Sequence, residues 1–195
     1  MITSKAGRLK IEQFEGCVLH AYKARPSERF FTIGYGHYGA DVTEGMTISQ
    51  EQADALFAAD LKRFETAVNN LGMSLTQAQF DALVDFAYNC GTGALSSVCK
   101  SKDLNTICNK IPEWCKDTAG NVLAGLKRRR AWEVSQIKQP SKFATVTADV
   151  LNIREEAGTD KIIIGTFKNG ETVAVYETWC KTSLGWVSAD YLKFD

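Results

Sequence analysis

The chain has 195 residues, of which 45% are hydrophobic and 24% are charged. This composition is apolar enough for a buried core and too polar for a membrane protein. The 23 basic residues balance the 23 acidic ones, with 17 basic and 15 acidic in residues 1–138 and 6 and 8 in residues 139–195. Neither part has the basic excess of a nucleic-acid-binding protein, so we do not expect nucleic acid as a partner.

The N-terminal segment and the cysteines indicate where the chain folds. Residues 1–8 lack the apolar run of a signal peptide, and no stretch approaches the roughly 20 apolar residues of a membrane span. We therefore expect synthesis in the cytoplasm and no membrane insertion. No CxxC pair occurs among the six cysteines, so we expect mostly free, buried thiols and no metal site. We also expect a monomer without a cofactor. The cysteines are Cys17, Cys90, Cys99, Cys108, Cys115 and Cys180.

The first elements in chain order are a helix and a small group of strands. Ser4 is a good N-cap for a helix that runs toward Glu15, and Gly16 is a stop signal. Residues 20–48 change character, because the segment 30–37 is aromatic, β-branched and interrupted by glycines. That pattern predicts short strands with tight turns.

Helices are predicted from residue 49 to residue 137. Residues 49–52 and 76–79 are capping boxes, each followed by apolar residues at a 3.6-residue period, and Gly72 and Gly91 are the expected stops. Asp103 is expected to cap a short helix that Pro112 interrupts. A last helix is predicted from Val122 to Ile137. We interpret the basic run at 127–130 on this helix as a solvated face.

The composition changes after the last predicted helix. Residues 139–144 are the expected linker, and residues 145–195 are expected to form a small all-β barrel. Turn signals separate its short β-rich runs. These runs are 143–147, 150–153, 161–167, 172–177 and 185–187.

Glu15 is a candidate general acid. Cleavage of a glycosidic bond requires a carboxyl group that keeps its proton until the leaving oxygen takes it. At the C-terminal end of a helix, the helix dipole disfavours negative charge. Glu15 is predicted to stand at such an end, beside Phe14 and before Gly16. Most glutamates at helix ends are surface residues, so this position alone is weak evidence.

The surrounding motifs resemble those of the phage-type lysozyme family. That family has Glu-Gly, Ala-Tyr and Thr-Ile-Gly-Tyr-Gly-His blocks in this order, and the chain has them at residues 15–16, 21–22 and 32–37. Residues 79–91 resemble its central helix, and residues 125–133 resemble its Gly-Leu-x-x-Arg-Arg-x-x-Glu helix.

The resemblance implies an α+β fold, with a mainly helical lysozyme-like domain and a small β lobe in residues 1–138. It implies that Glu15 is the general acid and that Thr32 positions the attacking water. Tyr22, Tyr35 and His37 fall on substrate-binding positions, although His37 could equally be structural.

One position departs from the family pattern. The family commonly has an aspartate nine residues after the glutamate, and Ala24 stands at that position here. The loop 24–29 is two residues longer than usual, and Glu28 is the nearest carboxylate that could fill the same space. The alternative is a surface Glu28 paired with Arg25 or Arg29.

Residues 145–194 resemble the bacterial SH3-like wall-binding domain. They contain Leu-Asn-Ile-Arg at 151–154 and Gly-Trp-Val at 185–187, in the order of that family. Aromatic residues suit a peptide or sugar groove, because flat rings bury much area with little loss of rotamer entropy. We expect Tyr176, Trp179 and Tyr191 to bind substrate, and Trp186 to lie in the barrel core.

Together these features predict a lysozyme that acts on bacterial peptidoglycan. We expect it to be made in the cytoplasm of a bacterial host and to act on the cell wall after release. Three alternatives stay open. Glu15 could serve a lytic transglycosylase that uses the substrate's own 6-hydroxyl as nucleophile. Cys17 with His20 or His37 could form a cysteine peptidase. The chain could also be a non-catalytic wall-binding protein on a decayed lysozyme fold.

Overall fold

The computed structural model describes residues 1–195 apart from 118, 140–141, 176–181, 183, 189–191 and 195. The chain divides into two compact units, Met1–Ile137 and Lys138–Asp195, and each has its own hydrophobic core. None of the helices in the described part is long and apolar enough to cross a membrane.

Helix α1 (Lys5–Glu15) begins and ends where the sequence predicts. The Ser4 hydroxyl accepts a hydrogen bond from the Gly7 N–H at 3.0 Å, which satisfies one of the free donors of the first turn. Gly16 ends the helix with a φ of 70°, a conformation that glycine adopts at little cost. Glu15 is therefore the last helical residue.

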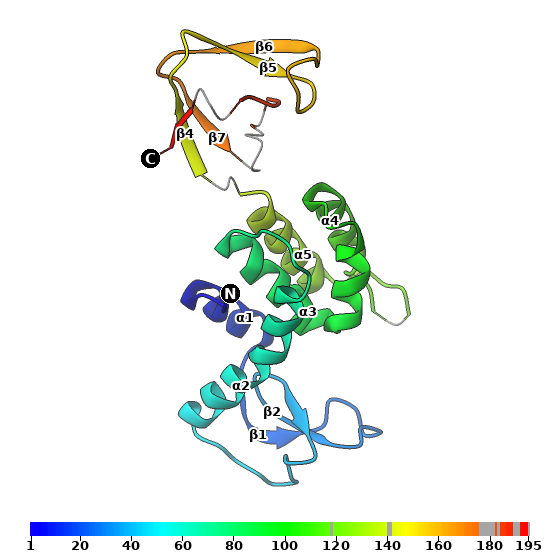
Figure 1. The fold of residues 1–195 in the computed structure, drawn as a ribbon. Helices are drawn as coiled ribbons and strands as arrows, with labels where there is room; N and C mark the ends of the chain where they lie inside the picture. The colour runs from blue at the N-terminus through cyan, green and yellow to red at the C-terminus, as the bar shows by residue number, and fades with distance from the viewer. Residues whose placement is uncertain (118, 140–141, 176–181, 183, 189–191, 195) are drawn as a thin grey trace. The chain divides into compact units, whose positions relative to one another are not determined.

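A three-stranded antiparallel sheet follows α1 and lies at one end of the first unit (Figure 1). Its strands are β1 (Val18–Tyr22), β2 (Phe31–Gly34) and β3 (His37–Gly39), in the order β1-β2-β3. Ile33 on the middle strand is fully buried, and its side chain packs with Val42, Ile48 and Ala53.

Helices α2 (Gln50–Asn69) and α3 (Gln77–Val98) both begin with the predicted capping boxes. Helix α3 is the centre of the unit, because residues 79–87 are all buried and it packs against α1, α2, α4 and α5. Gly91 has a φ of 85° and interrupts the helical conformation. The predicted stop is confirmed, because a first helical segment ends at Gly91 and a second one begins directly after it and runs to Val98.

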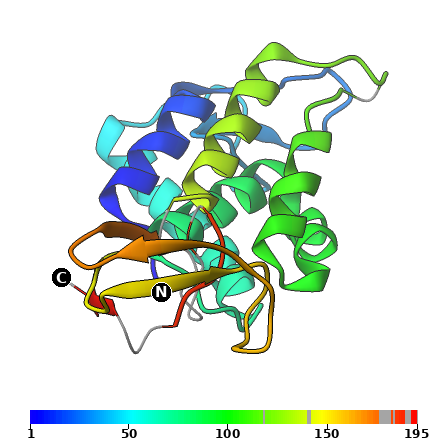
Figure 2. The ribbon, with the colours of Figure 1, turned by 90° about the horizontal axis from the view of Figure 1, so that it is seen from above.

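The last helices of the first unit are α4 (Leu104–Lys110), capped by Asp103, and α5 (Ala124–Ile137). A 3₁₀ turn at Ile111–Glu113 follows α4. Helix α5 lies beside α1, as Figure 2 shows, and the Phe14 and Trp132 rings meet edge to face at 5.7 Å.

The basic run on α5 departs from the expected solvated face. Lys127 and Arg128 are exposed, but Arg129 and Arg130 are only 3% and 1% exposed. Their buried positions follow from the carboxylates that surround them, because a buried guanidinium requires charged or hydrogen-bonding partners.

The second unit is built from five strands in its described part. Strands β4 (Lys142–Val146), β7 (Thr172–Val175) and β8 (Leu192–Phe194) form one sheet, in the order β7-β4-β8. Strands β5 (Val150–Arg154) and β6 (Ile163–Lys168) form a hairpin.

Valine, leucine and isoleucine side chains from both sheets form the core of the second unit. The expected strand at 185–187 is reduced to a single backbone pairing of Trp186 with Arg154, and Trp186 is half-buried. Val187 beside it is 1% exposed and belongs to the core.

Candidate active site

Glu15 lies between α5 and the turn that joins β2 to β3. Its side chain is 22% exposed, and its Oε1 accepts a hydrogen bond from Arg129 Nη1 at 2.6 Å. On the other side, a Cβ placed on Gly36 would lie 4.0 Å from Glu15 Oε2. The carboxyl group is therefore partly buried, bound by Arg129 on one side and adjacent on the other to the turn inside the Thr-Ile-Gly-Tyr-Gly-His block.

Arg129 divides its guanidinium between two carboxylates. Nε lies 3.1 and 3.2 Å from the two Asp85 oxygens, and Nη2 donates to Asp85 Oδ1 at 2.8 Å. Nη1 remains for Glu15, while the guanidinium carbon lies 5.1 Å from the centre of the Phe14 ring. Charge-assisted, two-pronged contacts of this kind are the strong and directional ones.

A second buried arginine extends this group of charged side chains away from Glu15. We call Glu15, Asp85, Arg129, Arg130 and Glu133 the Arg129 cluster. Arg130 donates from Nη2 to Glu133 Oε1 at 2.6 Å, and its Nη1 lies 2.6 Å from Cys90 Sγ. Burial raises the pKa of the Cys90 thiol, although the charge of Arg130 acts in the opposite direction. The sequence did not predict Arg129, Asp85 or Glu133 as site residues, and only the resemblance at 125–133 drew attention to that helix.

Thr32 and Tyr22 are neighbours on the β lobe. The register places Thr32 opposite Tyr22 on β1 and opposite Tyr38 on β3, so the three side chains share one face of the sheet. Ile33 points to the opposite face, into the core. Thr32 and Tyr22 are both half-buried.

Tyr35 connects the β2–β3 turn to helix α2. Its hydroxyl donates to Asp54 Oδ1 at 3.2 Å and accepts from Gln50 Nε2 at 2.9 Å. Burial and the nearby acidic groups raise the pKa of Tyr35 to about 12. Tyr88 donates to the Tyr35 carbonyl oxygen at 2.8 Å, so the central helix α3 also holds this turn.

Tyr88 lies within the electrostatic reach of Glu15. Burial raises the pKa of Tyr88, and the negative charges of Asp60 and Glu15 raise it further. Its ring also contacts Phe57 and Phe64 of α2, at 5.6 and 5.0 Å between ring centres.

His37 joins β3 to helix α2. Nδ1 lies 2.8 Å from Asp60 Oδ2, and Nε2 lies 3.0 Å from Asp41 Oδ2. Burial alone would lower the pKa of His37, but the hydrogen bonds to Asp41 and Asp60 outweigh it and raise the pKa. Both ring nitrogens face carboxylates, which fits an imidazolium with two donors. Through these two contacts His37 joins β3 to Asp41 and to helix α2.

Glu28 is bound to its own loop. Its Oε2 accepts a hydrogen bond from the Ala24 N–H at 3.0 Å. The Arg29 guanidinium carbon lies 5.0 Å from the centre of the Phe30 ring. The predicted substrate-binding residues Tyr176, Trp179 and Tyr191 lie outside the described residues.

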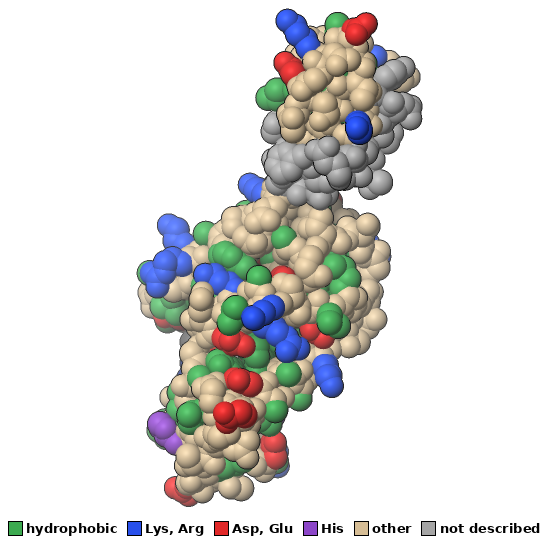
Figure 3. Space-filling model, turned by 90° about the vertical axis from the view of Figure 1, so that its left-hand side faces the viewer, with side chains coloured by type: hydrophobic (Ala, Val, Ile, Leu, Met, Phe, Trp, Pro, Cys, Tyr) green, Lys and Arg blue, Asp and Glu red, His purple; other side chains and the backbone are tan. Residues whose placement is uncertain are grey.

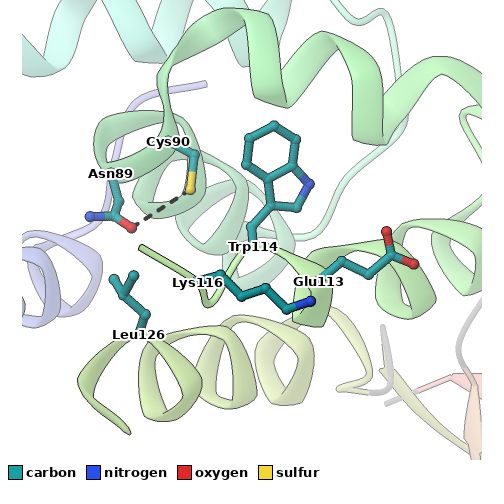
Figure 4. Close-up of a pocket in the computed structure, with 6 residues that line it drawn as sticks. All are labelled: Asn89, Cys90, Glu113, Trp114, Lys116 and Leu126. Carbon is teal, nitrogen blue, oxygen red and sulfur yellow. Dashed lines mark hydrogen bonds between the residues drawn. The ribbon is translucent and has the colours of Figure 1, made fainter. Parts of the chain in front are cut away.

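A pocket of about 520 Å³ lies beside the Arg129 cluster. Figure 4 shows six residues that line it, from α3, α5 and the segment between α4 and α5. Asn89 is one turn beyond Asp85 on α3, and Leu126 is one turn before Arg129 on α5. The lining residues are Asn89, Cys90, Glu113, Trp114, Lys116 and Leu126.

No group of three or more metal-binding side chains occurs among the described residues. Cys17 packs against the core of the β lobe, and His20 is exposed. On the face of the first unit drawn in Figure 3, acidic and basic side chains lie close together.

Comparisons with known proteins define the class of fold. Residues 12–133 match the phage lysozyme family, and residues 149–193 match the bacterial SH3 domain. The muramidase domain of SpmX from Asticaccaulis excentricus is similar to the first unit. It has a TM-score of 0.63 and 38% identity, over 70% of this chain and 97% of that domain. The predicted α+β class, a helical lysozyme-like domain before a small SH3-like one, is confirmed.

Two phage endolysins are similar in sequence. The endolysin of Bacillus phage B103 is 38% identical over 94% of this chain and 70% of its own length. The endolysin of Bacillus phage PZA is 45% identical, and the match covers 68% of this chain and 54% of that endolysin. The chain belongs to the phage lysozyme family and also carries a bacterial SH3 domain. It is a peptidoglycan hydrolase of the glycosidase class.

Proposed function

We propose that the chain cleaves the β-1,4 bond between N-acetylmuramic acid and N-acetylglucosamine in bacterial peptidoglycan, with Glu15 as the general acid. In this proposal, residues 1–138 form the catalytic domain, residues 139–144 form the linker, and residues 145–195 bind the enzyme to the cell wall. Release into the wall at lysis would bring the enzyme to this substrate.

The placement of Glu15 carries this proposal. Its side chain is 22% exposed, which leaves it accessible to a sugar while shielding it from bulk water. It ends helix α1, where the dipole opposes negative charge. Arg129 donates a hydrogen bond to the carboxyl group and orients it, and the β2–β3 turn lies beside it. A general acid must be both reachable and fixed in direction.

The second catalytic group is open to a direct test. We propose Thr32 as the residue that positions the water, since it lies on the face of the sheet opposite the buried Ile33. Glu28 is the proposed second carboxylate, and its bond to Ala24 holds it within the loop 24–29. A transglycosylase would need only Glu15 and the substrate's own 6-hydroxyl.

Wall binding is proposed for the second unit. Its match to the bacterial SH3 domain over residues 149–193 supports this role. The proposed ligand residues Tyr176, Trp179 and Tyr191 are tested by single changes to alanine. Removal of residues 140–195 should weaken sedimentation with purified walls while residues 1–138 keep their helical circular dichroism.

The main experiment compares the full chain with its Glu15→Gln variant on purified bacterial walls. The variant should not clear the suspension, yet it should sediment with the walls as well as the wild type does. Glu12→Gln, one turn earlier on the same helix, is the matched control and should keep clearing them. Retained lysis in Glu15→Gln would remove Glu15 from the proposed role.

Product analysis decides the reaction type. New reducing sugar ends indicate hydrolysis, anhydro-sugars indicate a transglycosylase, and new amino groups indicate a peptidase. The Glu28→Gln variant belongs in the same experiment. Wild-type activity in that variant would exclude Glu28 as a catalytic carboxylate.

A further inference from the structure

The buried end of the Arg129 cluster holds a carboxyl group that has no role in the proposed reaction. Glu133 on α5 is 0% exposed, and so is Asp85 on α3. Glu133 Oε1 accepts a hydrogen bond from Arg130 at 2.6 Å, but Oε2 is buried and has no donor among the described residues. An ionised Glu133 would leave a charged oxygen unpaired in the core, which is strongly unfavourable.

The missing partner of Glu133 Oε2 is explained if this oxygen carries a proton. Glu133 and Asp85 both face Arg129 in the core, and two ionised carboxylates near each other in a buried site repel each other. Burial raises the pKa of Glu133 well above its ordinary range, and the nearby Asp85 acts in the same direction. The charge of Arg130 opposes this shift but does not reverse it. A proton on Oε2 can be donated to Asp85.

Asp85 would then be held from two sides. Arg129 donates to it from Nε and Nη2, and a protonated Glu133 would donate to it from α5. A guanidinium is planar, so fixing the Nε edge on Asp85 also fixes the direction of Nη1. Nη1 is the donor that meets Glu15 at 2.6 Å.

We propose that Glu133 is a neutral carboxylic acid in the folded protein and donates a hydrogen bond to Asp85. Asp85 is then the positioning residue that orients the Arg129 guanidinium toward Glu15. This inference rests on the proposed function, because it assigns Asp85 an effect on catalysis through Glu15. The state of Glu133 itself can be measured without any activity.

Infrared spectroscopy of the full chain at neutral pH tests the proton. The difference spectrum of wild type minus Glu133→Gln should show the C=O band of a protonated carboxylic acid. Carboxylate bands alone in that difference spectrum would overturn the proposal. The result is independent of whether Glu15 is the general acid, so failure of the proposed function and failure of this inference are distinguishable.

Paired substitutions at position 133 test the hydrogen bond. Glutamine keeps a neutral donor and an acceptor of similar shape, so Glu133→Gln should recover most of the activity and thermal stability that Glu133→Ala loses. If Glu133 were ionised, glutamine would remove the buried negative charge that pairs with Arg130. Both variants should then lose activity and thermal stability to a similar extent. Equal losses in the two variants would therefore contradict the protonated state.

Substitution of Asp85 tests positioning. Asp85→Asn places amide hydrogens against Arg129, so we expect kcat on soluble glycan chains to fall by on the order of 100-fold with KM nearly unchanged. Asp81→Asn is the matched control, because Asp81 is buried one turn earlier on α3 and binds Ser4 instead of Arg129. An Asp85→Asn enzyme with wild-type kcat, or an equal loss in folded Asp81→Asn, would overturn the positioning role.

Discussion

Arg129 donates a hydrogen bond from Nη1 to Oε1 of Glu15 across 2.6 Å, which joins helix α5 to the last residue of helix α1. The same guanidinium donates hydrogen bonds to Asp85 from Nε and Nη2. A lysine at this position has one ammonium group and cannot serve both carboxylates with fixed geometry.

Arg129→Lys should therefore reduce the rate of wall clearing by on the order of 100-fold, because Glu15 loses its fixed orientation. The free energy of unfolding should fall by about 1–3 kcal/mol, as the buried Asp85 loses hydrogen bonds. Turbidity and thermal unfolding measure the two effects. Arg128→Lys, at the exposed neighbouring position, should change neither. An unchanged clearing rate in Arg129→Lys would show that the contact with Glu15 has no catalytic importance.

Gly36 lies beside Glu15 at a position where a substitution would add atoms next to the carboxyl group. It has a φ of 92°, and an added Cβ would lie 4.0 Å from Glu15 Oε2. Gly36→Ala should lower the free energy of unfolding by about 1–2 kcal/mol through backbone strain and should also reduce lysis. Gly45→Ala provides the comparison, since Gly45 has a φ of 75° and a Cβ there would meet nothing within 4 Å. Equal loss of lysis in both variants would trace the effect to strain alone.

The contacts of His37 with Asp41 and Asp60 make the stability of the β lobe depend on pH. The pKa of His37 is raised, so its contribution is complete below about pH 6.5, its ordinary value, and is lost as the pH rises through the folded-state pKa. The pKa of Asp41 is lowered, chiefly by the hydrogen bond to His37, so its contribution is complete above about pH 4 and is lost as the pH falls through the lowered pKa.

His37→Gln should therefore lower the unfolding temperature most between about pH 4 and 6.5. The expected decrease is about 2–4 °C, which corresponds to a loss of about 1 kcal/mol in the free energy of unfolding. The difference from wild type should shrink toward pH 9, as His37 loses its charge in both states. Calorimetry at constant ionic strength measures it. His20→Gln, at an exposed position on β1, controls for the loss of an imidazole. A difference that stays constant with pH would assign the effect to packing.

The buried thiols should resist alkylation. Cys99 is 2% exposed, and burial raises its pKa to about 11, so its thiolate fraction at pH 8 is on the order of 100-fold below that of a free cysteine. Iodoacetamide labelling of the native protein, read by mass spectrometry, should modify the half-buried Cys17 well before Cys99. After denaturation both should react. Rapid native labelling of Cys99 would mean that the segment after α3 opens readily.

Element boundaries of the first unit followed closely from the sequence, because local hydrogen bonds set them. Ser4, Ser49 and Thr76 each accept a hydrogen bond from a backbone N–H of the first turn, and such caps act within four residues. Gly91 also ends a helical segment as predicted, with a positive φ. The second segment, which runs on to Val98, was not predicted, because it depends on packing of residues 94–98 on the core.

The sequence by itself determined the two-part organisation, the main helices and the position of Glu15 at a helix end, since these depend on residues close together in the chain. Tertiary structure alone decided which charges are buried. Arg128 and Arg129 are adjacent and chemically alike, yet only Arg129 meets Glu15, which lies 114 positions away in the sequence. A run of basic residues does not reveal which members face the core, because that depends on the acidic groups that other helices bring there.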